Sequence, residues 1–102
     1  MEIIRGTTPT LIFTFSEIEP SDISVCYMLI KQRGQTIIEK TLSDGVVDEN
    51  GLSFTLTQTD TLALSTTNSA QVLLDWKTTG GVRGRSNVYD CAVKVAGIDN
   101  VI

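Results

Sequence analysis

The stretch Gly51-Leu52-Ser53-Phe54-Thr55-Leu56-Thr57 decides the fold class, because apolar and polar side chains alternate along it without a break. A period of two places Leu52, Phe54 and Leu56 on one face of an extended segment and the hydroxyl residues on the other. Asn50-Gly51, where the stretch begins, is a strong hairpin-turn signal. The pattern therefore predicts a β-strand with one buried face, entered through a tight turn.

The residues that follow this strand predict one short helix. Thr57-Gln58-Thr59-Asp60 has the spacing of a capping box, in which the hydroxyl and the carboxylate satisfy amides of the first helical turn. We expect a single helical turn here, with Leu62 and Leu64 covering one end of the core.

Strand patterns recur on both sides, separated by the turn signals Arg33-Gly34-Gln35, Asp44-Gly45 and Gly80-Gly81. In the last pattern, Tyr89, Cys91, Val93 and Val95 are expected to face inward. The strands expected outside residues 52–57 are Thr8 to Phe15, Ser24 to Gln32, Thr36 to Leu42, Val46-Val47, Ala70 to Thr78 and Gly84 to Val95.

The composition favours strands as well. Thr, Ile and Val make up 33 of the 102 residues, and these β-branched side chains suit a pleated sheet. One layer of strands could not bury so many inward apolar residues, whereas two facing sheets can. We therefore expect residues 1–102 to form one domain, an all-β, two-sheet antiparallel sandwich of about seven strands.

Charge and missing residue types exclude several function classes. The formal net charge is −4, opposite to the balance that neutralises phosphates, so no nucleic-acid partner is expected. Histidine is absent, which removes the usual general base and the commonest zinc ligand, and no enzyme is expected. Neither a signal peptide nor a membrane-spanning run is visible, which predicts synthesis in the cytoplasm and no membrane partner.

The acidic segment predicts neither a metal nor a cofactor. Asp44, Asp48 and Glu49 lie beside two glycine turns, as solvated hairpin loops usually do. Aligned as a calcium loop, the segment puts Val46 at the first ligand position and Thr57 where a bidentate glutamate is required. We expect no catalytic, cofactor-binding or metal-binding residue.

The two cysteines, Cys26 and Cys91, are 65 positions apart and both fall on the expected buried face. They are interpreted as small core residues that stay reduced in the cytoplasm. The alternative is a disulfide that joins two strands after release into an oxidising medium.

The segment Arg5-Gly6-Thr7-Thr8-Pro9-Thr10-Leu11-Ile12-Phe13 resembles the opening of a family of small structural proteins of phages and prophages of Gram-positive bacteria. The resemblance continues through Val25 to Gln32, Leu52 to Gln58 with Thr61-Leu62, and Gln71 to Trp76. Ser86 and a last strand that ends near Val101-Ile102 complete it. This family is similar to the immunoglobulin-like N-terminal domain of siphophage upper baseplate proteins. The resemblance implies an immunoglobulin-like sandwich, a virion location in the tail or baseplate, and no catalytic residues.

These observations predict a non-enzymatic structural protein of a phage particle that contacts other phage structural proteins and further copies of itself. The candidate contact residues are Ile3, Ile4, Arg5, Arg83 and Arg85. The apolar ends, Ile3-Ile4 and Val101-Ile102, are more often tucked into a domain's own sheet than used for assembly. The alternative is a carbohydrate- or host-surface-binding module, for which strand parity leaves only Tyr27 exposed among the aromatic residues.

Overall fold

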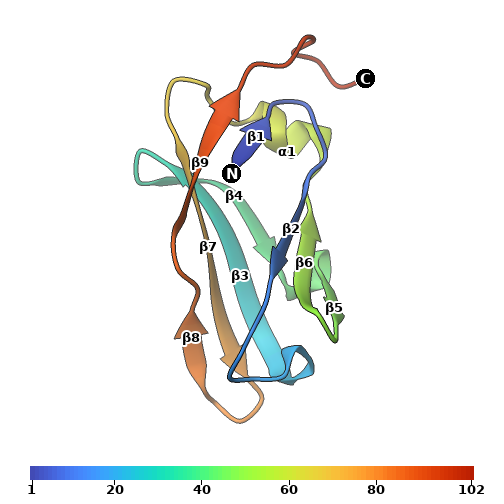
Figure 1. Cartoon of the computed structure of the whole chain (residues 1–102), viewed down its shortest axis with the longest axis vertical. Coiled ribbons are helices and arrows are strands. Elements are labelled where there is room, and N and C mark those ends of the chain that lie inside the picture. Colours follow the sequence, from blue (N-terminus) through green and yellow to red (C-terminus); the bar gives the residue numbers. More distant parts are fainter.

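The computed structural model describes every residue, Met1–Ile102, and contains nine strands arranged in two sheets (Figure 1). One helix, α1 (Gln58–Leu62), lies at one end of the molecule, and short 3-10 turns η1 (Pro20–Asp22) and η2 (Leu42–Asp44) occur in loops. The strands are β1 (Glu2–Ile4), β2 (Thr10–Phe13), β3 (Ile23–Gln32), β4 (Gln35–Thr41), β5 (Val46–Asp48), β6 (Gly51–Thr55), β7 (Ala70–Thr78), β8 (Arg83–Arg85) and β9 (Tyr89–Lys94).

The larger sheet has the order β1-β9-β7-β3-β4, with β8 added beside β7, and the smaller sheet has the order β2-β6-β5. In the larger sheet, β9, β7, β3 and β4 therefore lie side by side, and in the smaller sheet β6 lies between β2 and β5. The predicted all-β sandwich is confirmed. Two details were wrong: there are nine strands rather than about seven, and β1 runs parallel to β9.

One core joins the two sheets. Phe54 and Leu52 of β6 and Leu11 of β2 pack against Met28 and Leu74 of the larger sheet in a single cluster of 17 buried residues. The strand faces predicted from alternation supply most of this cluster, since every second side chain of a strand points to the same side. The chain thereby buries its apolar residues without needing a third layer.

The last strand is interrupted, which corrects the prediction of one strand from Gly84 to Val95. The Ser86 hydroxyl accepts a hydrogen bond from the Leu74 amide at 2.9 Å and donates one to the Asn87 carbonyl at 2.9 Å. A side chain thus takes a position in the ladder that a backbone carbonyl would fill, and the segment divides into β8 and β9, both paired with β7. Val95, expected inward, is exposed beyond β9.

A bulge explains why the alternation in residues 36–42 is blurred. Ile30 lies opposite Ile38, while the next residue, Lys31, lies opposite Thr36, so Ile37 is an extra residue in β4. The extra residue shifts the side-chain parity by one. The consecutive residues Thr36 and Ile37 are therefore both exposed, whereas Ile38 is buried.

The end of the sandwich that carries α1 is closed by polar side chains. The predicted capping box forms. The Asp60 carboxylate also forms an ion pair with Lys40 of β4, with 2.9 Å between Oδ2 and Nζ. The buried Thr61 hydroxyl donates to the Thr7 carbonyl at 2.8 Å. The buried amide of Gln32 donates to two carbonyls, those of Ser65 and Asn68, and accepts from the Ser65 amide. We call α1, residues 65–69, the tail 95–102 and the side chains that hold them the closed end.

The two apolar ends of the chain behave differently. Ile3 is fully buried in β1, as expected of an end tucked into its own sheet. Val101 and Ile102 are exposed, which contradicts that expectation for them, although the Gln58 amide holds the backbone of Ile102 through two hydrogen bonds. The tail therefore lies near α1 (Figure 1), and its apolar side chains Ile98, Val101 and Ile102 are exposed.

Both cysteines are buried and free, as the first of the two interpretations has it. Along β7, which separates β3 from β9, Cys26 lies beside Trp76 and Cys91 beside Ala70. The positions of the two cysteines along β7 are therefore six residues apart, which is about 20 Å in a strand. A disulfide cannot span this distance. Burial raises the pKa of Cys26 to about 11 and also raises the pKa of Cys91, so neither thiol is poised to ionise at neutral pH.

Candidate binding groove

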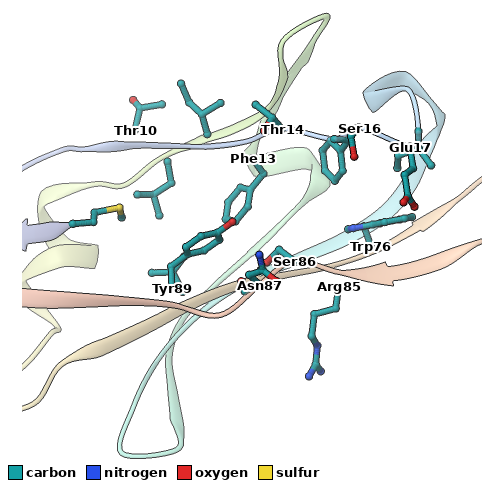
Figure 2. A pocket seen from close by; sticks show the side chains of 16 residues that line it. Thr10, Phe13, Thr14, Ser16, Glu17, Trp76, Arg85, Ser86, Asn87 and Tyr89 are labelled. Atoms are coloured by element: carbon teal, nitrogen blue, oxygen red, sulfur yellow. The ribbon is translucent and has the colours of Figure 1, made fainter.

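An open groove of about 790 Å³ lies between the two sheets on the side where β2 faces β8 and β9 (Figure 2). Figure 2 shows Phe13 and Tyr89 approaching each other from opposite walls, with Trp76 further along the groove. Thr10 lies toward one end, and Ser16 and Glu17 lie toward the other. The principal apolar lining residues are Leu11, Phe13, Phe15, Val72, Trp76 and Tyr89.

The groove is open because both sheets end in strands with an unpaired edge. On its first wall, β2 pairs only with β6. The Pro9 carbonyl accepts from the Leu56 amide at 2.9 Å. In an antiparallel ladder the bonding direction alternates from residue to residue, so Leu11 and Phe13 bond toward β6 as well. The backbone groups of Thr10 and Ile12 consequently face the free edge.

The opposite wall has free backbone groups too. Val82 and Ser86 bond to β7, so the alternation directs the backbone groups of Arg83 and Arg85 away from β7. On β9, the Ala92 amide donates to the Met1 carbonyl at 3.2 Å, which marks the point where β1 begins to cover that edge. The backbone groups of Asp90, two residues earlier, point to the same side as those of Ala92, but no strand lies beside them. The groove is thus bordered by two unpaired strand edges.

Aromatic rings form the deep part of the groove. Phe15 and Trp76 meet edge to face, with ring centroids 5.8 Å apart. Gly84 lies opposite Trp76 in the β7–β8 pair, and a Cβ on Gly84 would overlap the indole ring. Glycine at this position therefore lets the indole lie across β8. Trp76 is only partly buried, and it packs against the core cluster rather than within it.

Tyr89 corrects a second expectation from strand parity. It points toward the inter-sheet side as predicted, but its side of the sandwich is open and the residue is 49% exposed. Together with Tyr27, which is 44% exposed on the outer face of β3, two tyrosines rather than one are accessible. Strand parity predicts which face a ring occupies but not whether a second sheet covers it.

The five predicted contact residues lie in two separate places. Ile3 is buried in the core and cannot contact a partner without leaving it, whereas Ile4 is exposed on β1. Arg5 is engaged within the domain, donating to the Asp99 carboxylate at 2.7 Å and to the Leu62 carbonyl at 2.9 Å. Arg83 and Arg85 lie together on β8, whose free edge borders the groove. The structure thus brings together only these two.

Arg85 is oriented by a neighbour on β7. Its guanidinium donates to the Asp75 carboxylate at 2.8 Å, and Figure 2 shows the side chain pointing away from the groove. This hydrogen bond, together with the positive charges of Arg83 and Lys31, lowers the pKa of Asp75, and Asp75 in turn raises the pKa of Arg85. The groove wall is therefore formed by the backbone of β8, and its charges lie on the outer face.

The groove itself was missed by the sequence analysis. Its lining residues come from segments that are far apart in the chain, and only the pairing of β2 with β6 and of β8 with β7 determines which edges remain free. The available signals were the half-covered aromatics, Phe15, Trp76 and Tyr89, at the ends of their alternating patterns. Alternation alone assigned all three to the core.

Two further properties bear on the chemistry of the chain. The structure contains no group of three or more Cys, Asp or Glu residues placed to hold a metal ion. None of its helical segments has the length and apolarity needed to cross a membrane.

No protein-family model matches the chain, and a search of curated proteins finds no significant relative.

Proposed function

We propose that the chain is a non-enzymatic structural protein of a phage or prophage particle, associated with the tail or baseplate, that works through protein–protein contacts. The observation that carries the proposal is the apolar groove bordered by two unpaired strand edges. An extended segment of another particle protein would lie in this groove. The placement in a virion, after synthesis in the host cytoplasm, rests on the sequence resemblance.

Strand addition is the binding mode that suits this groove. An added strand forms main-chain hydrogen bonds with a free edge, and its alternate side chains enter apolar pockets. The free backbone groups of Ile12, which lines the groove, and of Asp90, on the uncovered part of the β9 edge, supply the first element, and the rings of Trp76 and Tyr89 supply the second. Exposed edges are normally blunted by charges, proline or a covering segment. The β2 edge has no charged residue between Thr10 and Phe13.

The test uses a variant that blocks one edge without disturbing the fold. In Ile12→Pro the lost amide hydrogen faces the free edge, and proline is tolerated on such edges. Ile12→Thr is the matched control, because it changes the same exposed side chain but keeps the backbone amide hydrogen. Tagged wild type, Ile12→Pro and Ile12→Thr are each mixed with lysate from an induced lysogen that carries the gene, and captured proteins are identified by mass spectrometry.

Virion proteins should be captured by wild type and by Ile12→Thr, and the captured amount should fall roughly tenfold or more with Ile12→Pro, as loss of edge pairing requires. Mass spectrometry of purified particles should also detect the chain. The proposal fails if no virion protein is captured or if Ile12→Pro captures as much as wild type. Trp76 is the only tryptophan, so its fluorescence reports occupation of the groove once the captured protein is purified.

A carbohydrate-binding module is the second candidate, favoured by the accessible ring of Tyr89 beside Trp76 in the groove. Sugars stack on such rings through their apolar faces. Titration with cell-wall polysaccharide of the host would then change Trp76 fluorescence, and Tyr89→Ala would abolish the change while leaving the melting temperature nearly unaltered. Unchanged fluorescence at saturating polysaccharide would exclude this candidate.

A further inference from the structure

A positively charged surface lies outside the groove, on the outer face of the larger sheet near the β7–β8 turn. The strand registers place Val25 beside Lys77 and Lys77 beside Arg83, and in the next row Tyr27 beside Asp75 and Asp75 beside Arg85. We call the exposed side chains Val25, Tyr27, Lys77, Val82, Arg83 and Arg85 the basic face. Asp75 is the acidic group within these rows, and its partner is Arg85.

A negatively charged surface lies at the end of the molecule opposite α1. Glu17, Glu19, Asp22 and Glu49 line one hollow of about 680 Å³ together with Thr78 of β7 and with Thr79, Gly80 and Val82 of the β7–β8 turn, so the hollow adjoins the basic face at Val82. The first three come from the connection between β2 and β3, and Glu49 comes from the turn between β5 and β6. No lysine or arginine lines this hollow. We call these four carboxylates the acidic end.

Neither surface neutralises the other within one molecule. The structure contains three ion pairs, which join Arg5 to Asp99, Lys40 to Asp60 and Arg85 to Asp75. Lys77 and Arg83 therefore form no ion pair, although the charge of Arg83 acts on Asp75, and no carboxylate of the acidic end pairs with a lysine or arginine. Two surfaces of opposite charge that form no ion pair with each other can complement those of another copy.

We propose that copies of this chain associate through these surfaces, the acidic end of one copy docking on the basic face of the next. Tyrosine and arginine, both present on the basic face, are the residue types that most often dominate binding at interfaces. Because the two surfaces differ, the contact is heterologous and leads to a closed ring or an open filament rather than a two-fold dimer. This inference goes beyond the strand-binding function and does not depend on it.

The experiment is sedimentation velocity across protein concentrations at low salt (about 20 mM) and at high salt (about 0.5 M), because salt screens exposed charges. Two neutralised variants, Lys77→Gln/Arg83→Gln and Glu19→Gln/Glu49→Gln, each retain one intact surface. The control variants, Lys94→Gln and Glu2→Gln, remove exposed charges that lie outside both surfaces. Circular dichroism and melting temperature verify that all the variants are folded.

Wild type and the controls should form assemblies of three or more chains at low salt, and these should dissociate at high salt. Each neutralised variant alone should remain monomeric at the same concentration. An equal mixture of the two should stop at a complex of two chains, because only one productive contact is available. A wild type that is monomeric at every concentration overturns the proposal, as does an assembly that both neutralised variants still form.

The same variants separate this proposal from the proposed function. Ile12→Pro should leave self-association unchanged, since β2 belongs to neither charged surface. Both neutralised variants should still capture the partner that wild type captures. Loss of capture without loss of assembly, or the reverse, then identifies which of the two proposals has failed.

Discussion

The closed end and the groove side of this small domain differ in how the rim of the two-sheet sandwich is covered. At the closed end, the Thr61 hydroxyl donates to a backbone carbonyl, and the side-chain oxygens of Gln32 and Asp60 accept from backbone amides. These backbone groups would otherwise be unpaired, and α1 covers the core. On the groove side, β2 and β8 each have one edge without a partner strand, and Trp76 and Tyr89 are left partly in solvent. Stability is therefore concentrated at one end, and accessible apolar surface along one side.

The contrast teaches that polar side chains, rather than more strands, close an end of this sandwich. A buried amide such as that of Gln32 stabilises only while all its partners are present, and it is costly when one is removed. Substituting an aromatic residue of the groove should cost less stability, because partial burial gives its ring only part of the stabilisation that a core residue has. Substitutions at the two places should therefore differ in kind as well as in size.

The largest expected effect separates a core ring from a groove ring. Phe54→Ala removes a ring that is 1% exposed, and it should lower the free energy of unfolding by about 3–5 kcal/mol. Phe15→Ala, at the groove, should cost less than about 2 kcal/mol, since this ring is only partly covered. Urea denaturation measures both. Equal losses would show that the groove is closed in solution.

Gln32→Leu tests the polar closure directly. The substitution keeps the side-chain volume but leaves the Ser65 amide and two carbonyls without their partner, for an expected loss of about 1–3 kcal/mol. Gln71→Leu is the control, because the Gln71 amide bonds to exposed side chains and should cost less than about 0.5 kcal/mol. Urea midpoints compare the two variants. A neutral Gln32→Leu would contradict the view that this network holds the closed end.

Asp60→Asn should cost about 0.5–1 kcal/mol near neutral pH, because it removes the ion pair with Lys40 and the charge at the start of α1. Burial acts to raise the pKa of Asp60, but hydrogen bonds from Thr57 and Lys40 outweigh it and lower the pKa below its ordinary value of 3.8. The contribution of the charge is thus complete above that value and is lost as the pH falls through the lower folded pKa. Melting temperatures of wild type and variant should converge in acid. A difference that persists there would exclude the charge as its cause.

The smallest effect on stability is expected from Ile12→Pro, at less than about 0.5 kcal/mol, because the lost amide faces the free edge. Leu11→Pro provides the contrast one residue earlier. Its amide bonds toward β6 and its side chain is buried, so this variant should be unfolded or strongly destabilised. Thermal melts of the pair check the register. Similar losses in both would mean that the free side of β2 has been assigned to the wrong residues.

Much of the sandwich is predictable from local pattern. Uninterrupted alternation in residues 52–56 predicted a strand and its buried face, as did the inward positions of Val72 and Leu74 in the strand expected over residues 70–78, and the spacing of Thr57 and Asp60 predicted α1. These signals are local, since they depend on side-chain period and on hydrogen bonds within one turn. The bulge at Ile37 and the interruption at Ser86 disturbed the same period, and the sequence alone could not separate a disturbed strand from its end.

The features that required the whole fold were the parallel β1 and the groove. Nothing near Ile3 indicates that its partner is Val93, and nothing near Tyr89 indicates that its side of the sandwich is open. Both depend on which strands become neighbours, a property of long-range pairing. For the same reason the candidate contact residues were only partly useful: Ile3 proved to be core, while Arg83 and Arg85 proved to flank the groove.

The pairing of β1 with β9 has a consequence for how the domain is made. Glu2–Ile4 leaves the ribosome before its partner, Ala92–Lys94, and residues 5–91 separate the two strands in the chain. Contacts of such sequence separation slow folding, because a long loop must be closed before they form. During synthesis Ile3 therefore has no core to enter, and the nascent chain carries an uncovered apolar N-terminal segment until residue 94 has emerged. Completion of the larger sheet therefore waits for β9.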